Sequence, residues 1–149
     1  MARYSVLMQR TASPTLSVGG IQAPGAGMRR FELYELVIGS EAAGADNPFL
    51  WQVQRSTTAG TSTAVTPLAL NPADAAAVTV GGSNFTVDPT LTAAALPLSI
   101  PLNQRATFRW VAAPRGGIIV AATANAGLAI RTPTSSAVAV TCTAHFEEH

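Results

Sequence analysis

The side chains best suited to chemistry lie at the C-terminal end of the chain, where two histidines flank two glutamates in the segment His145-Phe146-Glu147-Glu148-His149. Imidazole and carboxylate groups are ligands for zinc and nickel, so this composition is compatible with metal binding. Spacing alone does not specify a metal site. We therefore interpret the segment as a polar tail that lies in solvent or against a neighbouring subunit, and we expect no metal and no cofactor.

Catalytic groups are otherwise scarce. Nucleophilic catalysis needs a serine, cysteine or threonine beside a positioned base, and the only histidines are His145 and His149. The chain has no Gly-Xaa-Ser-Xaa-Gly motif. Among the eight carboxylates no glycosidase pair stands out, because Glu32 and Glu35 point to opposite faces of a regular strand. The segment 25–27, Gly-Ala-Gly, lacks the third glycine of a nucleotide-binding loop. We predict that the protein is not an enzyme.

The two tryptophans offer a different chemistry, because indole rings can stack on the apolar faces of sugars. Trp51 and Trp110 each fall on the apolar side of an alternating segment, which predicts that they are buried between sheets. A carbohydrate- or receptor-binding β-sandwich therefore remains an alternative, and it would need exposed aromatic rings near loop ends.

All nine basic residues are arginines, and the net charge of +1 is spread along the chain without blocks. This distribution lacks the basic patch of a nucleic-acid-binding protein, so we expect no nucleic-acid partner. A guanidinium group makes bidentate contacts to carboxylates at interfaces, although GC-rich codon usage explains an arginine-only composition equally well. The arginines that we expect to contact a partner are Arg3, Arg10, Arg105 and Arg109.

The composition as a whole indicates a chain that is covered by neighbours. Charged residues make up 11% of the sequence and hydrophobic residues 48%, whereas soluble domains usually carry about 25% charged residues. Much of the surface must then be neutral, which favours a homo-oligomer or a larger assembly. A length of 149 residues suits one main domain.

The single cysteine, Cys142, excludes an intramolecular disulfide. The N-terminus lacks the apolar run of a secretory signal, and no apolar segment approaches the roughly 18 residues that would span a bilayer. We expect synthesis in a cytoplasm and no membrane partner.

Short alternating segments separated by Gly, Pro, Asn and Ser predict an all-β fold. The final one, 138–146, places Val138, Val140, Cys142 and Ala144 on one face, so Cys142 should be buried. We expect a jelly-roll-like two-sheet β-sandwich. The predicted strands span 30–38, with a bend near Glu35, and 49–55, 78–80, 85–87, 96–102, 106–112, 118–120, 128–131 and 138–146.

Turns and edges follow from the same pattern. The segment 81–84, Gly-Gly-Ser-Asn, predicts a hairpin, and so does the segment 114–117, Pro-Arg-Gly-Gly. Prolines inside 96–102 place that strand at a sheet edge. The segment 71–77 begins with Asn-Pro and predicts a short helix.

Residues 1–27 differ from the β-sandwich domain that we expect over 28–149. They are rich in glycine and proline yet contain Leu16, Val18 and Ile21. We predict an extended N-terminal arm, and the three apolar side chains are candidates for contact with a partner.

Three segments resemble small virion proteins of tailed bacteriophages: ELVIGSEA at 35–42, FLWQVQRSTTAGT at 49–61 and IPLNQRATFRW at 100–110. Proteins of that kind are similar to capsid decoration, or cement, proteins. The resemblance implies a β-sandwich or jelly roll that is often a trimer, located on the capsid exterior, where it bridges subunits of the major capsid protein. It implies no catalytic or ligand-binding residue.

The expected function is therefore that of a non-enzymatic virion protein made in the host cytoplasm. A tail or fibre-associated virion subunit is the main alternative, beside the carbohydrate- or receptor-binding sandwich already named.

Overall fold

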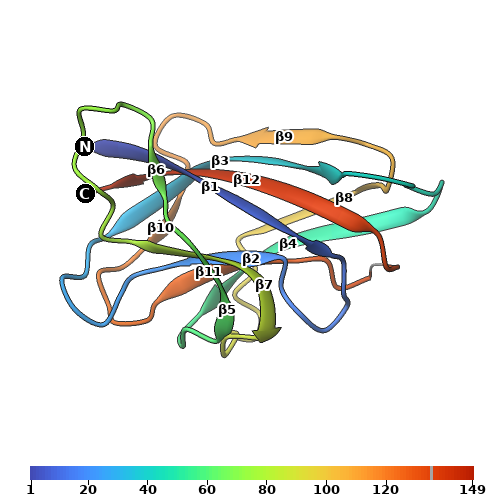
Figure 1. Cartoon of the computed structure of the whole chain (residues 1–149), viewed down its shortest axis with the longest axis horizontal. Helices are drawn as coiled ribbons and strands as arrows, with labels where there is room; N and C mark the ends of the chain where they lie inside the picture. The colour runs from blue at the N-terminus through green and yellow to red at the C-terminus, as the bar shows by residue number, and fades with distance from the viewer. Residues whose placement is uncertain (135) are drawn as a thin grey trace.

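The computed structural model describes residues 1–134 and 136–149, and every regular element within them is a β-strand. The strands form two antiparallel six-stranded sheets packed face to face, and the two chain termini lie at the same end of the molecule (Figure 1). This confirms the prediction of an all-β, two-sheet sandwich. The jelly-roll arrangement within that class stays a prediction.

The first sheet has the strand order β10-β3-β12-β1-β6, with β9 also paired to β3. Its strands are β1 (Ala2–Thr11), β3 (Phe31–Ser40), β6 (Leu68–Ala69), β9 (Phe108–Val111), β10 (Ile118–Val120) and β12 (Ala139–Glu148). The second sheet has the order β5-β7-β2-β11-β4-β8. Its strands are β2 (Gly19–Gln22), β4 (Pro48–Ser56), β5 (Thr61–Val65), β7 (Val80–Val87), β8 (Leu98–Asn103) and β11 (Gly127–Arg131).

The core forms where alternating side chains of the two sheets meet. On β12 every second residue is buried, which confirms the predicted burial of Cys142. Facing strands contribute Phe31, Trp51 and Ile130 to the same cluster. The register between β3 and β12 shifts where His145 pairs with Glu35 and the next residue pairs with Leu33. Tyr34 is thus the extra residue of a β-bulge, as the mixed alternation near Glu35 predicts.

The structure corrects the prediction of an arm over residues 1–27. Strand β1 pairs with β12 along its whole length, and β2 lies between β7 and β11 in the centre of the second sheet. The side chains of Val18 and Ile21 are fully buried in the core of their own domain. Residues 1–27 therefore belong to the sandwich, and no boundary separates them from residues 28–149.

The glycines that suggested an irregular arm have a packing role instead. A Cβ atom on Gly19 would overlap the side chain of Met8, and one on Gly81 would meet the side chain of Val6. Strand β1 of the first sheet thus packs directly against the backbone of β2 and β7. Glycine is required because the two sheets approach closely at this point.

Neither of the two predicted hairpins forms in the structure. The segment 81–84 does not form a hairpin: β7 runs through it, and Asn84 has a φ of 54°. The pairing with β5 jumps from Thr61↔Val87 to Thr63↔Ser83, so the residue with positive φ produces a bulge. The segment 114–117 does not form a hairpin either, because β9 and β10 lie one after the other along β3.

The predicted helix over 71–77 is also absent from the structure, which has a turn there with the N–H of Asp74 bonded to the carbonyl of Asn71 at 3.0 Å. So short a helix is unstable without an apolar face to bury, and this segment is mostly alanine. The edge position predicted for 96–102 is confirmed, since among the described strands β8 pairs with β4 alone. No helix able to cross a membrane occurs in the described part of the chain.

We predict that Ile21→Ala lowers the free energy of unfolding by about 2–5 kcal/mol, because it leaves a cavity under β2. Thr15→Ala, at an exposed position of the preceding loop, should change it by less than about 0.5 kcal/mol. Urea denaturation followed by circular dichroism measures both. Equal free energies of unfolding for the two variants would instead support an arm that does not pack in the core.

Candidate interaction surface

Among the described residues, the gap between the two sheets beside Trp51 is too small for a ligand. The gap beside Trp51, lined by Leu36, Ile38 and Ile130 among others, has a volume of only about 10 Å³. That is about the space of one water molecule, and its apolar lining gives a water no partner. This gap is therefore not a ligand site.

The tail residues are not gathered at one site. Strand β12 continues to Glu148, so His145 and Glu147 face outward while Glu148 faces the core. The side chain of His149 lies 3.7 Å from a carboxylate oxygen of Glu32. Within residues 1–134 and 136–149, no group of three or more possible metal ligands comes together. The interpretation of this segment as a polar tail is corrected, because it is the ordered end of a central strand.

Glu148 is a buried carboxylate that the sequence analysis overlooked, although the alternation of β12 extends to it. Its Oε1 accepts a hydrogen bond of 2.6 Å from the backbone N–H of Thr79, and its Oε2 lies buried with no hydrogen-bond partner among the described residues. Burial raises the pKa of the neighbouring Tyr4 hydroxyl, and the charge of Glu148 raises it further. The contact fastens the start of β7 to the last strand.

The seven candidate partner-binding residues separate into two groups. Val18 and Ile21 are buried in the core and Leu16 is half-buried, so these apolar side chains are not available as an exposed contact surface. Arg10 is half-buried and bonded within the molecule. The exposed candidates are Arg3, Arg105 and Arg109.

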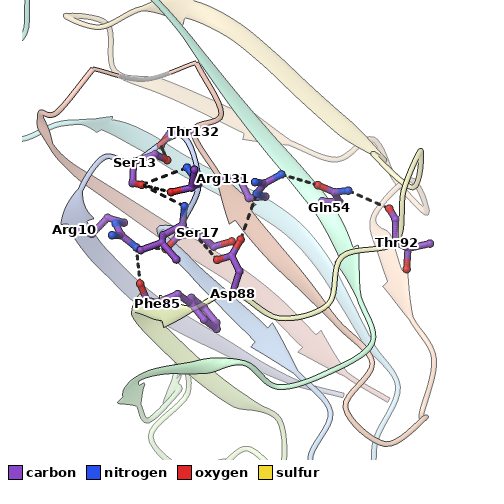
Figure 2. Close-up of polar contacts among 11 residues, drawn as sticks. Arg10, Ser13, Ser17, Gln54, Phe85, Asp88, Thr92, Arg131 and Thr132 are labelled. Atoms are coloured by element: carbon purple, nitrogen blue, oxygen red, sulfur yellow. Dashed lines mark hydrogen bonds and ion pairs between the residues drawn. The ribbon is translucent and has the colours of Figure 1, made fainter.

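Arg10 belongs to a polar network that joins β1 to the second sheet (Figure 2). Its guanidinium donates hydrogen bonds to the carbonyls of Ser17 and Phe85 at 2.8 and 2.9 Å. The carboxylate of Asp88 accepts a bond of 2.7 Å from the Ser17 N–H and lies 3.7 Å from the Nε of Arg131. Arg131 in turn donates to Gln54 at 3.1 Å. The network holds loops and strands in place, which is a structural role.

A second cluster lies on the outer face of the first sheet. The carboxylate of Glu35 on β3 accepts a hydrogen bond from Arg109 on β9, and its other oxygen is 3.0 Å from Nδ1 of His145 on β12. Tyr34 stacks on the imidazole with ring centroids 6.2 Å apart. The side chain of Arg109 is 65% exposed whereas Glu35 is only 12% exposed. The cluster therefore joins three neighbouring strands and still presents a guanidinium to solvent.

Apolar side chains are exposed next to that cluster, along the edge formed by β9 and β10. Phe108 is 43% exposed, Val111 50% and Ile119 38%. Trp110 is only half-buried, and Phe108 is not buried, so the prediction of a core face on 106–112 holds only in part. These strands lie at the margin of the first sheet (Figure 1), where no further strand pairs with them among the described residues.

Two other groups singled out from the sequence, Trp51 and Cys142, are inaccessible. Trp51 is buried beside Phe49, with ring centroids 5.9 Å apart, so it offers no face to a sugar. Burial raises the pKa of the Cys142 thiol far above its ordinary value, which keeps it protonated and unreactive. The β9–β10 edge with Arg109 is thus the strongest candidate for contact with a partner.

We predict that Asp88→Ala destabilises the protein by about 1–3 kcal/mol, because it removes the acceptor of the Ser17 N–H and the carboxylate beside Arg131. Asp46→Ala, at an exposed loop position, is the matched control and should cost less than about 1 kcal/mol. Chemical denaturation compares the two. A loss of stability no larger for Asp88→Ala would contradict a structural role for the network.

We predict a pH-dependent contribution from Glu35. The hydrogen bond from Arg109 lowers the pKa of this carboxyl from its ordinary 4.5, with burial opposing and His145 supporting the shift. A carboxyl group whose pKa is lower in the folded state stabilises the fold at pH values above its unfolded-state pKa. This stabilisation disappears as the pH falls through the folded-state pKa.

The difference in unfolding free energy between wild type and Glu35→Gln should therefore be largest near neutral pH and shrink below a pH of about 4.5. Denaturation curves across that pH range measure it. Glu147→Gln on the neighbouring strand provides the control. A difference that does not change with pH would show that the ion pair contributes nothing.

Comparison with protein-family models, with curated proteins and with solved structures finds no match to this chain. No residue role can therefore be transferred from a relative, and function has to be inferred from this chain's own surface.

Proposed function

We propose that this protein is a non-enzymatic virion protein that decorates the capsid of a tailed bacteriophage and bridges subunits of its major capsid protein. The observation that carries the proposal is the exposed apolar edge of β9 and β10, with which no further strand pairs among the described residues. Side chains such as Phe108 and Val111 would gain from burial against another protein. The resemblance of 35–42, 49–61 and 100–110 to decoration proteins supports the identity of that partner.

A decoration protein needs a rigid body whose contacts are repeated many times over a capsid. Here the core is continuous across both sheets, and polar networks fix the loops at the ends of strands. The charged fraction of 11% lowers the cost of removing water from the surface at each contact. We propose a homo-oligomer, with a trimer as the arrangement that suits three-fold positions, located on the capsid exterior and made in the host cytoplasm.

The proposal predicts that purified protein binds to phage particles stripped of it, and that imaging places its density outside the capsid shell. Phe108→Ser should reduce retention on particles on the order of tenfold, because it removes a ring that is 43% exposed. Val87→Ser, at a 58% exposed position on β7, is the control and should bind as wild type does. Sedimentation of the free protein tests for the trimer.

Thermal unfolding must show that both variants fold as wild type does, since neither side chain is buried. Density on the tail or on a fibre would replace capsid decoration by the alternative of a tail-associated subunit. Failure of the folded wild-type protein to bind any part of the particle would refute a virion role.

A further inference from the structure

The four sheet margins differ in how well they are protected against pairing with another chain. At one margin of the first sheet β6 pairs over only two residues. In the second sheet, β8 contains Pro101, which has no N–H to donate, and β5 pairs irregularly with β7. Strand β9 has no proline, and its sequence Phe-Arg-Trp-Val has high β-propensity. It is the margin most open to a further strand.

The orientation of the β9 backbone can be read from one hydrogen bond. The N–H of Ala112 donates to the carbonyl of Tyr34 at 2.8 Å, so it points toward β3. Successive residues of a strand alternate in this direction, and therefore Arg109 and Val111 turn their N–H and C=O groups away from β3. Those groups form a row to which an extended chain can add with regular hydrogen bonds.

On β9 and in the loops at its two ends, every charged residue is an arginine. The sequence contains no aspartate or glutamate between residues 89 and 146, and Arg105, Arg109 and Arg115 lie on or beside β9. Glu35 contacts Arg109 from β3, and Glu41, which shares a shallow cavity with Arg105, accepts a hydrogen bond from Thr141. Two copies of this edge would bring like charges together, which disfavours pairing with a second copy.

The side chains of β9 alternate between two environments. Phe108 and Trp110 are in register with the buried residues Ile38 and Leu36, so they lie on the side of the sheet that faces the core. Arg109 lies on the opposite side, where it reaches Glu35. A strand added to β9 would be complementary if it alternated apolar residues beside Phe108 and Trp110 with carboxylates beside Arg109.

We propose that the outer edge of β9 is a docking site for an acidic, extended segment of a partner protein, in which carboxylate and apolar residues alternate. The segment adds to the first sheet as a new edge strand. This proposal deepens the proposed function. It rests on that function only where it names the major capsid protein as the source of the segment.

The direct test uses a terminally blocked peptide of about eight residues, the length of an ordinary strand, in which glutamate alternates with valine. Isothermal titration or fluorescence anisotropy should detect binding to the wild-type protein and much weaker binding of the same peptide with lysine in place of glutamate. The affinity should fall with added salt, because the contact is partly electrostatic. A peptide N-methylated at alternate backbone amides, which cannot complete the ladder, should not bind.

The protein variants separate the backbone from the charge. Val111→Pro removes an outward N–H without touching the bond from Ala112 to Tyr34, and it should weaken peptide binding on the order of tenfold or more. Arg115→Glu should weaken it several-fold. Arg29→Glu makes the same charge change at an exposed position in the loop before β3, and it should leave binding within about a factor of two.

The proposal would be overturned if the peptide did not bind to the wild-type protein, or if Val111→Pro or N-methylation left peptide binding unchanged. It would also be overturned if Val111→Pro dissociated a homo-oligomer, because a second copy of the chain would then occupy the edge. Peptide binding without particle binding would refute capsid decoration and leave the docking site standing. Particle binding by folded Val111→Pro at wild-type affinity would refute the docking site alone.

Discussion

The close approach of β1 to the glycines of the second sheet is the constraint on which the rest of this structure depends. Met8 and Val6 occupy the space where Gly19 and Gly81 would otherwise carry side chains. A larger residue at either glycine would push the sheets apart at this corner. Because β1 is also paired with β12 over ten residue positions, the contact connects the first sheet to β2 and β7 of the second.

Several features follow from that contact. The backbone N–H and carbonyl of Gln9 bond to the hydroxyl of Ser83 on β7 at 2.8 and 3.0 Å, which covers the edge of β1 that β6 leaves open. The next residue, Arg10, bonds to carbonyls beside and within the second sheet. The corner is thereby closed by packing and by hydrogen bonds together, and the exposed pairing edge is left at the far side of the first sheet, on β9.

The sequence predicts the fold class because alternation is a local signal. The apolar residues of β12, the edge position of β8 and the bulge at Glu35 can all be read from neighbouring residues. The arm over 1–27 could not be judged in this way, since Gly19 has the same local pattern whether it is solvent-exposed or pressed against Met8. Only the tertiary contact distinguishes the two cases.

The same limit applies to the turns. The positive φ of Asn84 agrees with the turn-like composition of 81–84, yet whether such a residue ends a strand or bulges it depends on the partner strand. For the interaction surface, sequence identified Arg109 but placed Phe108 inside, because period-2 alternation assigns a face without telling whether another sheet covers it. The burial of Arg10 could not be predicted either. It depends on Ser17, which lies across a turn, and on Asp88, which is distant in the sequence.

The uneven protection of the sheet margins supports a specific role for β9. Proline in β8, the short pairing of β6 and the Ser83 contact to β1 each oppose the addition of a foreign strand. Strand β9 has neither a proline nor an inward-facing charge to protect it in this way. The edge instead combines exposed apolar side chains with a guanidinium held in place by Glu35. Like charge on every copy of the edge opposes self-pairing, while the open backbone remains available to a segment of opposite charge.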